Sequence, residues 1–189
     1  MQHAVFITLF LPLVSFSSHA QDTFQAEDWK RAERNIKRLK ADKFPQLPVT
    51  VREYLSKSAC SVPQPYGARP PQNVISGYFT GSSEKDWAVL CSRNGVSSIL
   101  VFRHGDSVPF ADLARQHDFI FLQGLGLGQI GFSRIISVAT PQGMRAHFAY
   151  RGWKPPRISH EGIDDSFEDK ASTVYYFARG KWLTFPGSD

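Results

Sequence analysis

Apolar residues follow a helical period in the first third of the chain. Between residues 24 and 41 they recur at steps of three to five, which predicts an amphipathic helix with a narrow apolar stripe. The residues of this stripe are Phe24, Trp29, Ala32, Ile36 and Leu39. Proline residues then break the pattern. A second, short helix is expected over 49–57, with its inner side formed by Val51, Tyr54 and Leu55.

From residue 73 onward the pattern changes to the alternation that is typical of strands. Three strands are expected, over 74–79, 86–92 and 97–103. Since side chains alternate across a strand, the middle one has two apolar faces: Trp87, Val89 and Cys91 on one, Ala88 and Leu90 on the other. Asn94-Gly95 is a strong hairpin-turn signal. Together these segments predict a three-stranded antiparallel meander.

The remainder of the chain predicts shorter elements. We expect a short helix over 109–117, strands over 119–122 and 133–138, a glycine-rich loop over 124–131, one helical turn over 143–148, a loop over 151–157, and a closing hairpin of 172–178 and 181–185. Helices come first and strands follow, which favours the α+β class. The expected architecture is a single domain, 21–189. Its N-terminal helices pack on an antiparallel sheet made of the meander plus the C-terminal hairpin.

The first twenty residues have the features of an export signal. Residues 4–14 form an apolar run that is too short to span a bilayer as a helix. Ser18 and Ala20 supply the small-x-small pattern that signal peptidase requires. We therefore expect a signal peptide, 1–20, cleaved after Ala20, and a periplasmic or secreted chain with no transmembrane segment. Because the n-region holds no Lys or Arg, a buried N-terminal strand or a membrane anchor remains the alternative.

Cys60 and Cys91 are the two cysteines of the chain. An even cysteine count combined with an export signal favours a disulfide between them. The bridge would close a loop of about thirty residues and contribute roughly 3–4 kcal/mol in the chain-entropy model. The alternative is two buried free thiols.

The formal net charge of +5 is unevenly distributed. Residues 24–43 hold seven basic and four acidic side chains, a net charge of +3. A candidate basic face on the predicted helix consists of Lys30, Arg31, Arg34, Lys37 and Arg38. It is either the solvated side of a helix whose Trp29, Ile36 and Leu39 dock on the sheet, or a site for an anionic surface such as lipid headgroups. A nucleic-acid partner is disfavoured.

The densest polar cluster lies near the C-terminal end. Its members are His160, Glu161, Asp164, Asp165, Glu168 and Asp169. The simplest interpretation is a solvated loop before the last hairpin, anchored by Ile163 and Phe167. The alternatives are a divalent-cation site or a carboxylate that acts as a general base. The spacing does not fit an EF-hand loop, so we expect no metal and no cofactor. A further hypothesis is that this acidic stretch meets the basic helix and latches it to the sheet.

The stretch 77–90 resembles one hairpin of the FG-GAP or VCBS repeat, with a strand, a short polar turn and Asp86-x-Ala88-Val89 on the next strand. The family's turn binds Ca²⁺ through Asp or Asn oxygens, whereas here only Glu84 and Asp86 could ligate. The resemblance therefore implies the hairpin and no Ca²⁺ site. The strand 87–92, the acidic stretch and the ending 180–183 are similar to a set of uncharacterised exported bacterial proteins, a resemblance that implies no activity.

Two patterns that would indicate nucleotide binding or catalysis are incomplete or absent. Gly126, Gly128 and Gly131 match the spacing of a dinucleotide fingerprint. The following residues predict a strand, so there is no helix N-terminus to receive a pyrophosphate. No Gly-x-Ser-x-Gly elbow is present. We therefore expect an exported binding or interaction module, whose partner is another exported protein or an anionic surface. The alternative function is a small exported hydrolase that uses the region 160–169.

Overall fold

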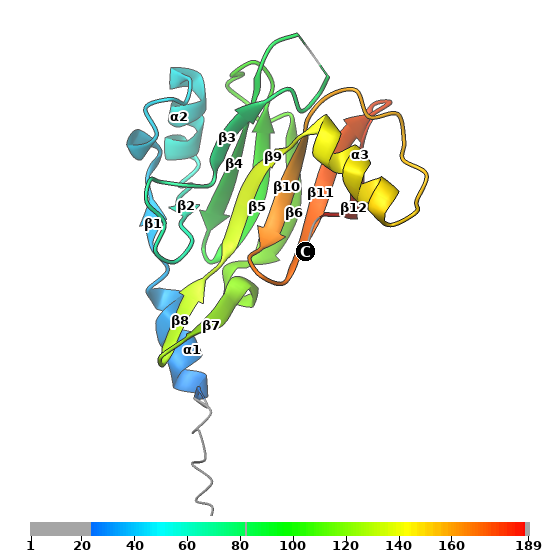
Figure 1. The fold of residues 1–189 in the computed structure, drawn as a ribbon. Helices are drawn as coiled ribbons and strands as arrows, with labels where there is room; N and C mark the ends of the chain where they lie inside the picture. Colours follow the sequence, from blue (N-terminus) through cyan, green and yellow to red (C-terminus); the bar gives the residue numbers. More distant parts are fainter. Residues whose placement is uncertain (1–23, 82, 188–189) are drawn as a thin grey trace, which may run out of the picture.

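Two antiparallel sheets face each other in the computed structural model, which describes residues 24–81 and 83–187. Each sheet has four strands (Figure 1). The first contains β3 (Val74–Gly77), β4 (Asp86–Arg93), β5 (Val96–Phe102) and β6 (Ala111–His117). The second contains β9 (Arg134–Ala139), β10 (Gly162–Phe167), β11 (Ala171–Ala178) and β12 (Lys181–Pro186). The mixed α+β class is confirmed. The meander and the closing hairpin lie in different sheets, so the expectation of one sheet is wrong.

A shared core lies between the two sheets. Alternation along each strand sends every second apolar residue inward. The core contains Ala88, Leu90, Ile99 and Val101 from the first sheet and Ile136 and Ile163 from the second. These six residues are buried. The two faces assigned to β4 from the sequence are therefore confirmed.

The β4–β5 hairpin forms at the expected turn. Asn94 and Gly95 both have positive φ, 52° and 75°, which matches the twist of the flanking strands. Beyond β5 the sequence prediction is wrong, because 109–117 is not a helix. Most of it forms the edge strand β6, which pairs with β5 through a register shift between Ser97 and Ile99. The backbone groups along β5 need partners, and this requirement overrides the modest helix propensity of the segment.

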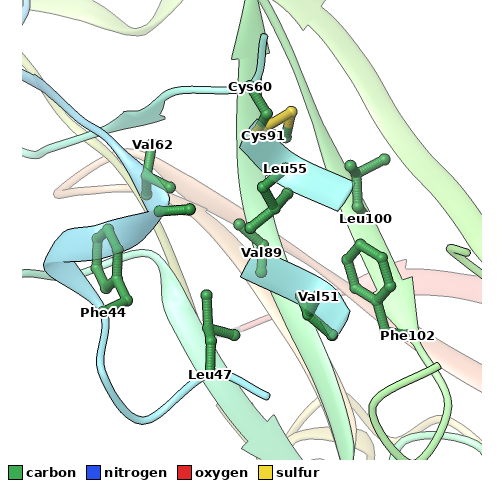
Figure 2. Packing of buried hydrophobic residues seen from close by; sticks show 11 residues of the cluster. Phe44, Leu47, Val51, Leu55, Cys60, Val62, Val89, Cys91, Leu100 and Phe102 are labelled. Carbon is green, nitrogen blue, oxygen red and sulfur yellow. A yellow bond between two sulfur atoms is a disulfide. The ribbon is translucent and has the colours of Figure 1, made fainter. Parts of the chain in front are cut away.

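Helix α2 (Val49–Lys57) has the bounds that its apolar spacing predicts. Its buried residues, Val51 and Leu55, belong to a cluster with Val89, Leu100 and Phe102 of the first sheet (Figure 2). The figure also shows the Cys60–Cys91 disulfide at the edge of this cluster. The Cα atoms of the two cysteines are 5.5 Å apart, so the predicted bridge is confirmed.

Helix α1 (Ala26–Arg34) is shorter than predicted and has no buried residue. It ends at Asn35, and the chain then forms β1 (Arg38–Leu39), which pairs with β2 (Val62–Pro63). The carbonyl of Lys37 accepts a hydrogen bond from the Gln64 N–H at 2.8 Å. The backbone of 36–39 therefore bonds to a distant segment instead of continuing the helix. A 3-10 turn (Ala41–Lys43) follows.

The glycine-rich segment forms a hairpin. Strand β7 (Leu122–Gly126) pairs with β8 (Gln129–Phe132), and Gly126 and Gly128 have φ of 81° and 70° in the turn. Strand β9 follows two residues later, so no helix N-terminus faces these glycines. The strand predicted over 119–122 is instead mostly a 3-10 helix (Asp118–Phe121).

The acidic stretch 160–169 is not a loop, because most of it forms β10, an interior strand of the second sheet. One of its carboxylates, that of Asp165, forms an ion pair with Arg134, whose side chain is 0% exposed. The same guanidinium donates to the Ser97 hydroxyl at 2.9 Å and to the Ala114 carbonyl at 2.8 Å, both in the first sheet. The pair therefore joins the two sheets. This is why an acidic sequence can occupy an interior strand.

Helix α3 (Pro141–Tyr150) is longer than the single turn expected and lies on the outer face of the second sheet (Figure 1). Thr140 caps its start by accepting a hydrogen bond from the Gly143 N–H at 3.1 Å. At its end Gly152 has φ of 66°, and the N–H groups of Gly152 and Trp153 donate to the carbonyls of Ala149 and Phe148. This is a Schellman motif. The helix buries Met144 and Phe148 against Ile158, Val174 and Tyr176.

Across residues 24–81 and 83–187 no helix is long and apolar enough to cross a membrane. The predicted signal peptide, 1–20, lies outside the described residues.

Candidate functional site

A pocket of about 310 Å³ opens between α3 and the outer face of the second sheet. Its floor is one row of paired residues, one from each strand: Ser137, Asp164, Val174 and Phe185. Its helical wall is made of Gly143, Met144 and His147. Residues at spacings of three and four share one side of a helix, which explains why these three meet the same pocket. The walls are mainly apolar, with a few polar groups, as in many small-molecule sites.

Asp164 is the carboxylate of this pocket. Its Oδ2 accepts a hydrogen bond from the Ser166 hydroxyl at 3.1 Å. Its Oδ1 is buried and has no hydrogen-bond partner among the described residues. Burial raises the pKa of Asp164, and the neighbouring hydroxyls of Ser172 and Ser166 lower it; the Asp165 charge raises the pKa further, and His147 lowers it. The pocket thus holds an acceptor whose charge is poorly compensated.

His147 brings the second polar group to the pocket. Its Nε2 atom is buried and, within the part of the chain that the structure describes, has no hydrogen-bond partner. The imidazole lies edge-on to the indole of Trp153, with 6.4 Å between ring centroids. The Schellman motif at the end of α3 places this indole beside the imidazole.

The end of β12 closes the pocket beside Asp164. Gly187 accommodates this close approach, because a Cβ on it would lie 1.9 Å from the Ser172 Oγ and 2.8 Å from the Asp164 Oδ1. A side chain here would displace one of these groups. The glycine therefore allows the backbone to pack directly against the polar floor.

The chemistry of the pocket favours binding. Two of the residues that line it, Asp164 and His147, each have a buried polar atom without a partner among the described residues, and such atoms call for an explanation. Residues such as Met144, Val174 and Phe185 offer contacts to an apolar body. Within residues 24–81 and 83–187 no group of three or more His, Cys, Asp or Glu side chains could hold a metal ion.

The polar cluster predicted over 160–169 is dispersed by the fold. His160 stacks on Tyr176 with 4.4 Å between ring centroids, and its Nε2 lies 2.9 Å from the Phe177 carbonyl oxygen. Glu161 accepts a hydrogen bond from the Tyr78 N–H at 2.8 Å. His160 therefore attaches the loop before β10 to β11, and Glu161 attaches the same loop to the backbone just after β3.

The other acidic residues of the cluster also separate. Asp165 faces the inter-sheet core and pairs with Arg134. Glu168 and Asp169 lie on the exposed turn between β10 and β11, where partial burial and the neighbouring Asp169 carboxylate raise the pKa of Glu168. Of the six predicted residues, Asp164 alone lines the pocket.

The predicted basic face is largely neutralised. Lys30 pairs with Glu27 at 2.9 Å and Arg31 with Asp28 at 2.6 Å, both within α1. Arg38 pairs with the buried Asp118 at 2.7 Å. Arg34 and Lys37 are exposed. Among the described residues no ion pair joins this face to the acidic stretch, so the proposed latch between them is not present.

Sequence reasoning missed His147, which completes the pocket. The only local signals were Thr140-Pro141, a good helix start, and Gly152, a good helix end. They delimit α3 and could have placed His147 on the same side as Met144. Which strand this side covers depends on pairings far apart in the sequence. Comparison of the chain with protein-family models, with curated proteins and with solved structures finds no match.

Proposed function

We propose that this chain is an exported binding protein that holds a small ligand in the α3 pocket. The ligand has a head that donates hydrogen bonds, an amine or a hydroxyl, and an apolar body. The observation that carries this proposal is that two residues lining one pocket, Asp164 and His147, each have a buried polar atom without a partner among the described residues, Oδ1 and Nε2. Leaving such a group unsatisfied costs about 1–3 kcal/mol, so a ligand that supplies a donor relieves this cost.

Export is supported by the disulfide. Bridges such as Cys60–Cys91 persist in oxidising compartments and are rare where thiols are kept reduced. The Ser18-x-Ala20 pattern supports the same compartment from the sequence. We therefore propose that the mature protein is periplasmic or secreted, and that it begins at Gln21.

The binding proposal is tested with three probes that share one apolar chain: n-hexylamine, n-hexanol and n-hexanoate. Backbone amide shifts are recorded by NMR on the full mature protein. We expect the amine or the alcohol to shift the amides of α3 and β10, with a dissociation constant on the order of 1 mM for so small a ligand. Hexanoate, which offers no donor when ionised, should bind more weakly.

Two variants make the test specific. Asp164→Asn removes the acceptor charge and should weaken binding of the amine, whereas Asp42→Asn removes an exposed carboxylate elsewhere and should not. Absence of α3 and β10 shifts with every probe, or equal binding by the wild type and Asp164→Asn, contradicts the proposal.

A small exported hydrolase is the second candidate. It is favoured by one observation: Ser137, Asp164 and His147 line the same pocket, so a hydroxyl, a carboxylate and an imidazole are near one another. Hydrolysis of p-nitrophenyl butyrate that is lost in both His147→Ala and Ser137→Ala would favour the hydrolase over the binding protein. Equal rates in the wild type and both variants would reject it.

A further inference from the structure

The segment 141–160, which comprises α3 and the loop after it, is basic and aromatic. It contains no Asp or Glu. Its Lys and Arg residues are all exposed: Arg145, Arg151, Lys154 and Arg157. Tyr150 is 88% exposed and Trp153 is 44% exposed. The segment therefore carries its positive charge without acidic neighbours in sequence.

The fold holds the exposed indole in a defined place. The backbone N–H of Trp153 donates to the Phe148 carbonyl at 2.9 Å. The indole packs edge-on against the Phe148 ring, with 6.3 Å between ring centroids. The Arg151 guanidinium lies 5.7 Å from the same indole. Two prolines, Pro155 and Pro156, restrict the loop that follows. The Trp153 indole is therefore held in place before any partner binds.

The turn between β11 and β12 adds two more cations beside the basic loop. The His160 Nε2 atom lies 2.9 Å from the Phe177 carbonyl oxygen, which holds the end of the loop beside the end of β11. Two residues further along, the β11–β12 turn carries Arg179, and β12 begins with Lys181. Both are exposed. The basic loop and this turn therefore lie at the same end of the second sheet.

We propose that the segment 141–160 is a docking surface for the anionic headgroups of a phospholipid bilayer. Arg and Lys pair with lipid phosphates. Trp and Tyr side chains are enriched at the level of the headgroups, where the ring contacts apolar chains and its polar group contacts water. The exposed rings and cations of this segment are the residue types that such an interface requires. This surface and the α3 pocket bind different kinds of ligand. The pocket offers a hydrogen-bond acceptor, whereas this surface offers cations.

The test is co-sedimentation of the full mature protein with vesicles. Vesicles of phosphatidylglycerol mixed with phosphatidylcholine are compared with vesicles of phosphatidylcholine alone, at low and at high salt. We expect binding to the anionic vesicles only, weakened by salt. The triple variant Arg151→Gln, Lys154→Gln, Arg157→Gln should lose on the order of a hundredfold in vesicle affinity, at about fivefold per charge.

A matched variant in α1 and the residues just after it distinguishes a docking surface from an effect of net charge alone. Lys30→Gln, Arg34→Gln, Lys37→Gln removes the same number of charges from the other basic segment and should retain most of the binding. Trp153→Phe should abolish quenching of tryptophan fluorescence by brominated lipids. Circular dichroism confirms that each variant is folded.

Three outcomes would overturn the proposal. They are equal losses in the two triple variants, no binding to anionic vesicles, or binding of single-stranded DNA or a sulfated polysaccharide without binding of vesicles. Asp164→Asn should bind vesicles like the wild type, so failure of the pocket and failure of the docking surface are distinguishable.

Discussion

Arg134 and Asp165 form a bidentate ion pair, in which Nε and Nη2 of the guanidinium each lie 2.8 Å from one carboxylate oxygen. The arginine comes from β9 and the aspartate from β10, and the guanidinium also reaches backbone and side-chain oxygens of the first sheet. The Phe121 ring lies 4.4 Å from the guanidinium carbon. Every part of the arginine thus has a partner, which is the condition under which a buried charge is tolerated.

Arg134→Met should lower the free energy of unfolding by about 3–5 kcal/mol, because it leaves the Asp165 carboxylate buried without its partner. The measurement is urea unfolding followed by fluorescence. Arg31→Met is the matched control, since its pair with Asp28 is exposed on α1 and worth about 0–1 kcal/mol. Equal losses in the two variants would mean that the buried pair has no special role.

Asp164→Asn should raise stability at neutral pH. Burial is the main cause that raises the folded pKa of Asp164 above its ordinary value of 3.8. The folded state therefore holds the proton more tightly than the unfolded state, and wild-type stability falls as pH rises through the folded pKa. The stability gain of the variant should vanish at pH values below 3.8 and grow toward neutral pH. Asp42→Asn, on an exposed side chain, should show no such pH dependence; a gain independent of pH in Asp164→Asn would contradict the assignment.

Replacing both Cys60 and Cys91 by Ala should lower stability by about 3–4 kcal/mol, the chain-entropy estimate for cysteines 31 residues apart. The same loss should follow reduction of the wild-type protein, measured by urea unfolding with and without a reductant. The double variant is the control, because a reductant should not change its stability. Two thiols that alkylate freely in the native exported protein would refute the bridge.

Thr140→Ala should lower stability by about 1 kcal/mol, because the Gly143 N–H loses its cap at the start of α3. Thr140→Ser keeps a hydroxyl and should retain most of the stability. Thermal unfolding measures both. If the capping role is correct, Thr140→Ala should also weaken binding of the amine probe, since the first turn of α3 forms one wall of the pocket.

Protein recovered from the periplasm or the medium should begin at Gln21. This follows from the expected cleavage after Ala20, and intact-mass analysis measures it. Ala20→Pro is a suitable variant, because proline at that position should block processing while the mature domain remains unchanged. Recovery of the full-length chain in the cytoplasm would contradict export.

Elements with strong local signals were predictable from the sequence. The β4–β5 and β11–β12 hairpins follow from Asn94-Gly95 and Arg179-Gly180, where the structure has positive φ at each residue. Helix α2 follows from the spacing of Val51 and Leu55. In each case the residues that determine the element are close in sequence, so local rules are sufficient.

Elements that depend on distant partners were not predictable. The segment that forms β6 has the composition of a helix, and it is extended because β5 offers it backbone partners. The acidic β10 is an interior strand because Arg134, 31 residues away, neutralises Asp165. No residue near either segment in the sequence indicates these partners.

The pocket was predictable only in part. Asp164 was among the predicted polar residues, but its neighbours in sequence face other directions, because successive side chains of a strand alternate. His147 meets the same pocket only after α3 crosses the strands of the second sheet. The residue types were visible in the sequence, and their grouping was not.

The apolar interior is divided into three clusters, and this division has a consequence for the motions of the native state. The cluster beneath α3 has five buried members, whereas the one beneath α2 is larger and covalently tied through Cys60 and Cys91. Detachment of α3 would expose the smaller cluster and leave the inter-sheet core intact. Amide hydrogens of α3 should therefore exchange with solvent through a partial opening that costs less than global unfolding, while those of β4 and β5 exchange only when the whole domain unfolds. A ligand held beneath α3 would slow this partial opening and leave exchange in β4 and β5 governed by the global transition.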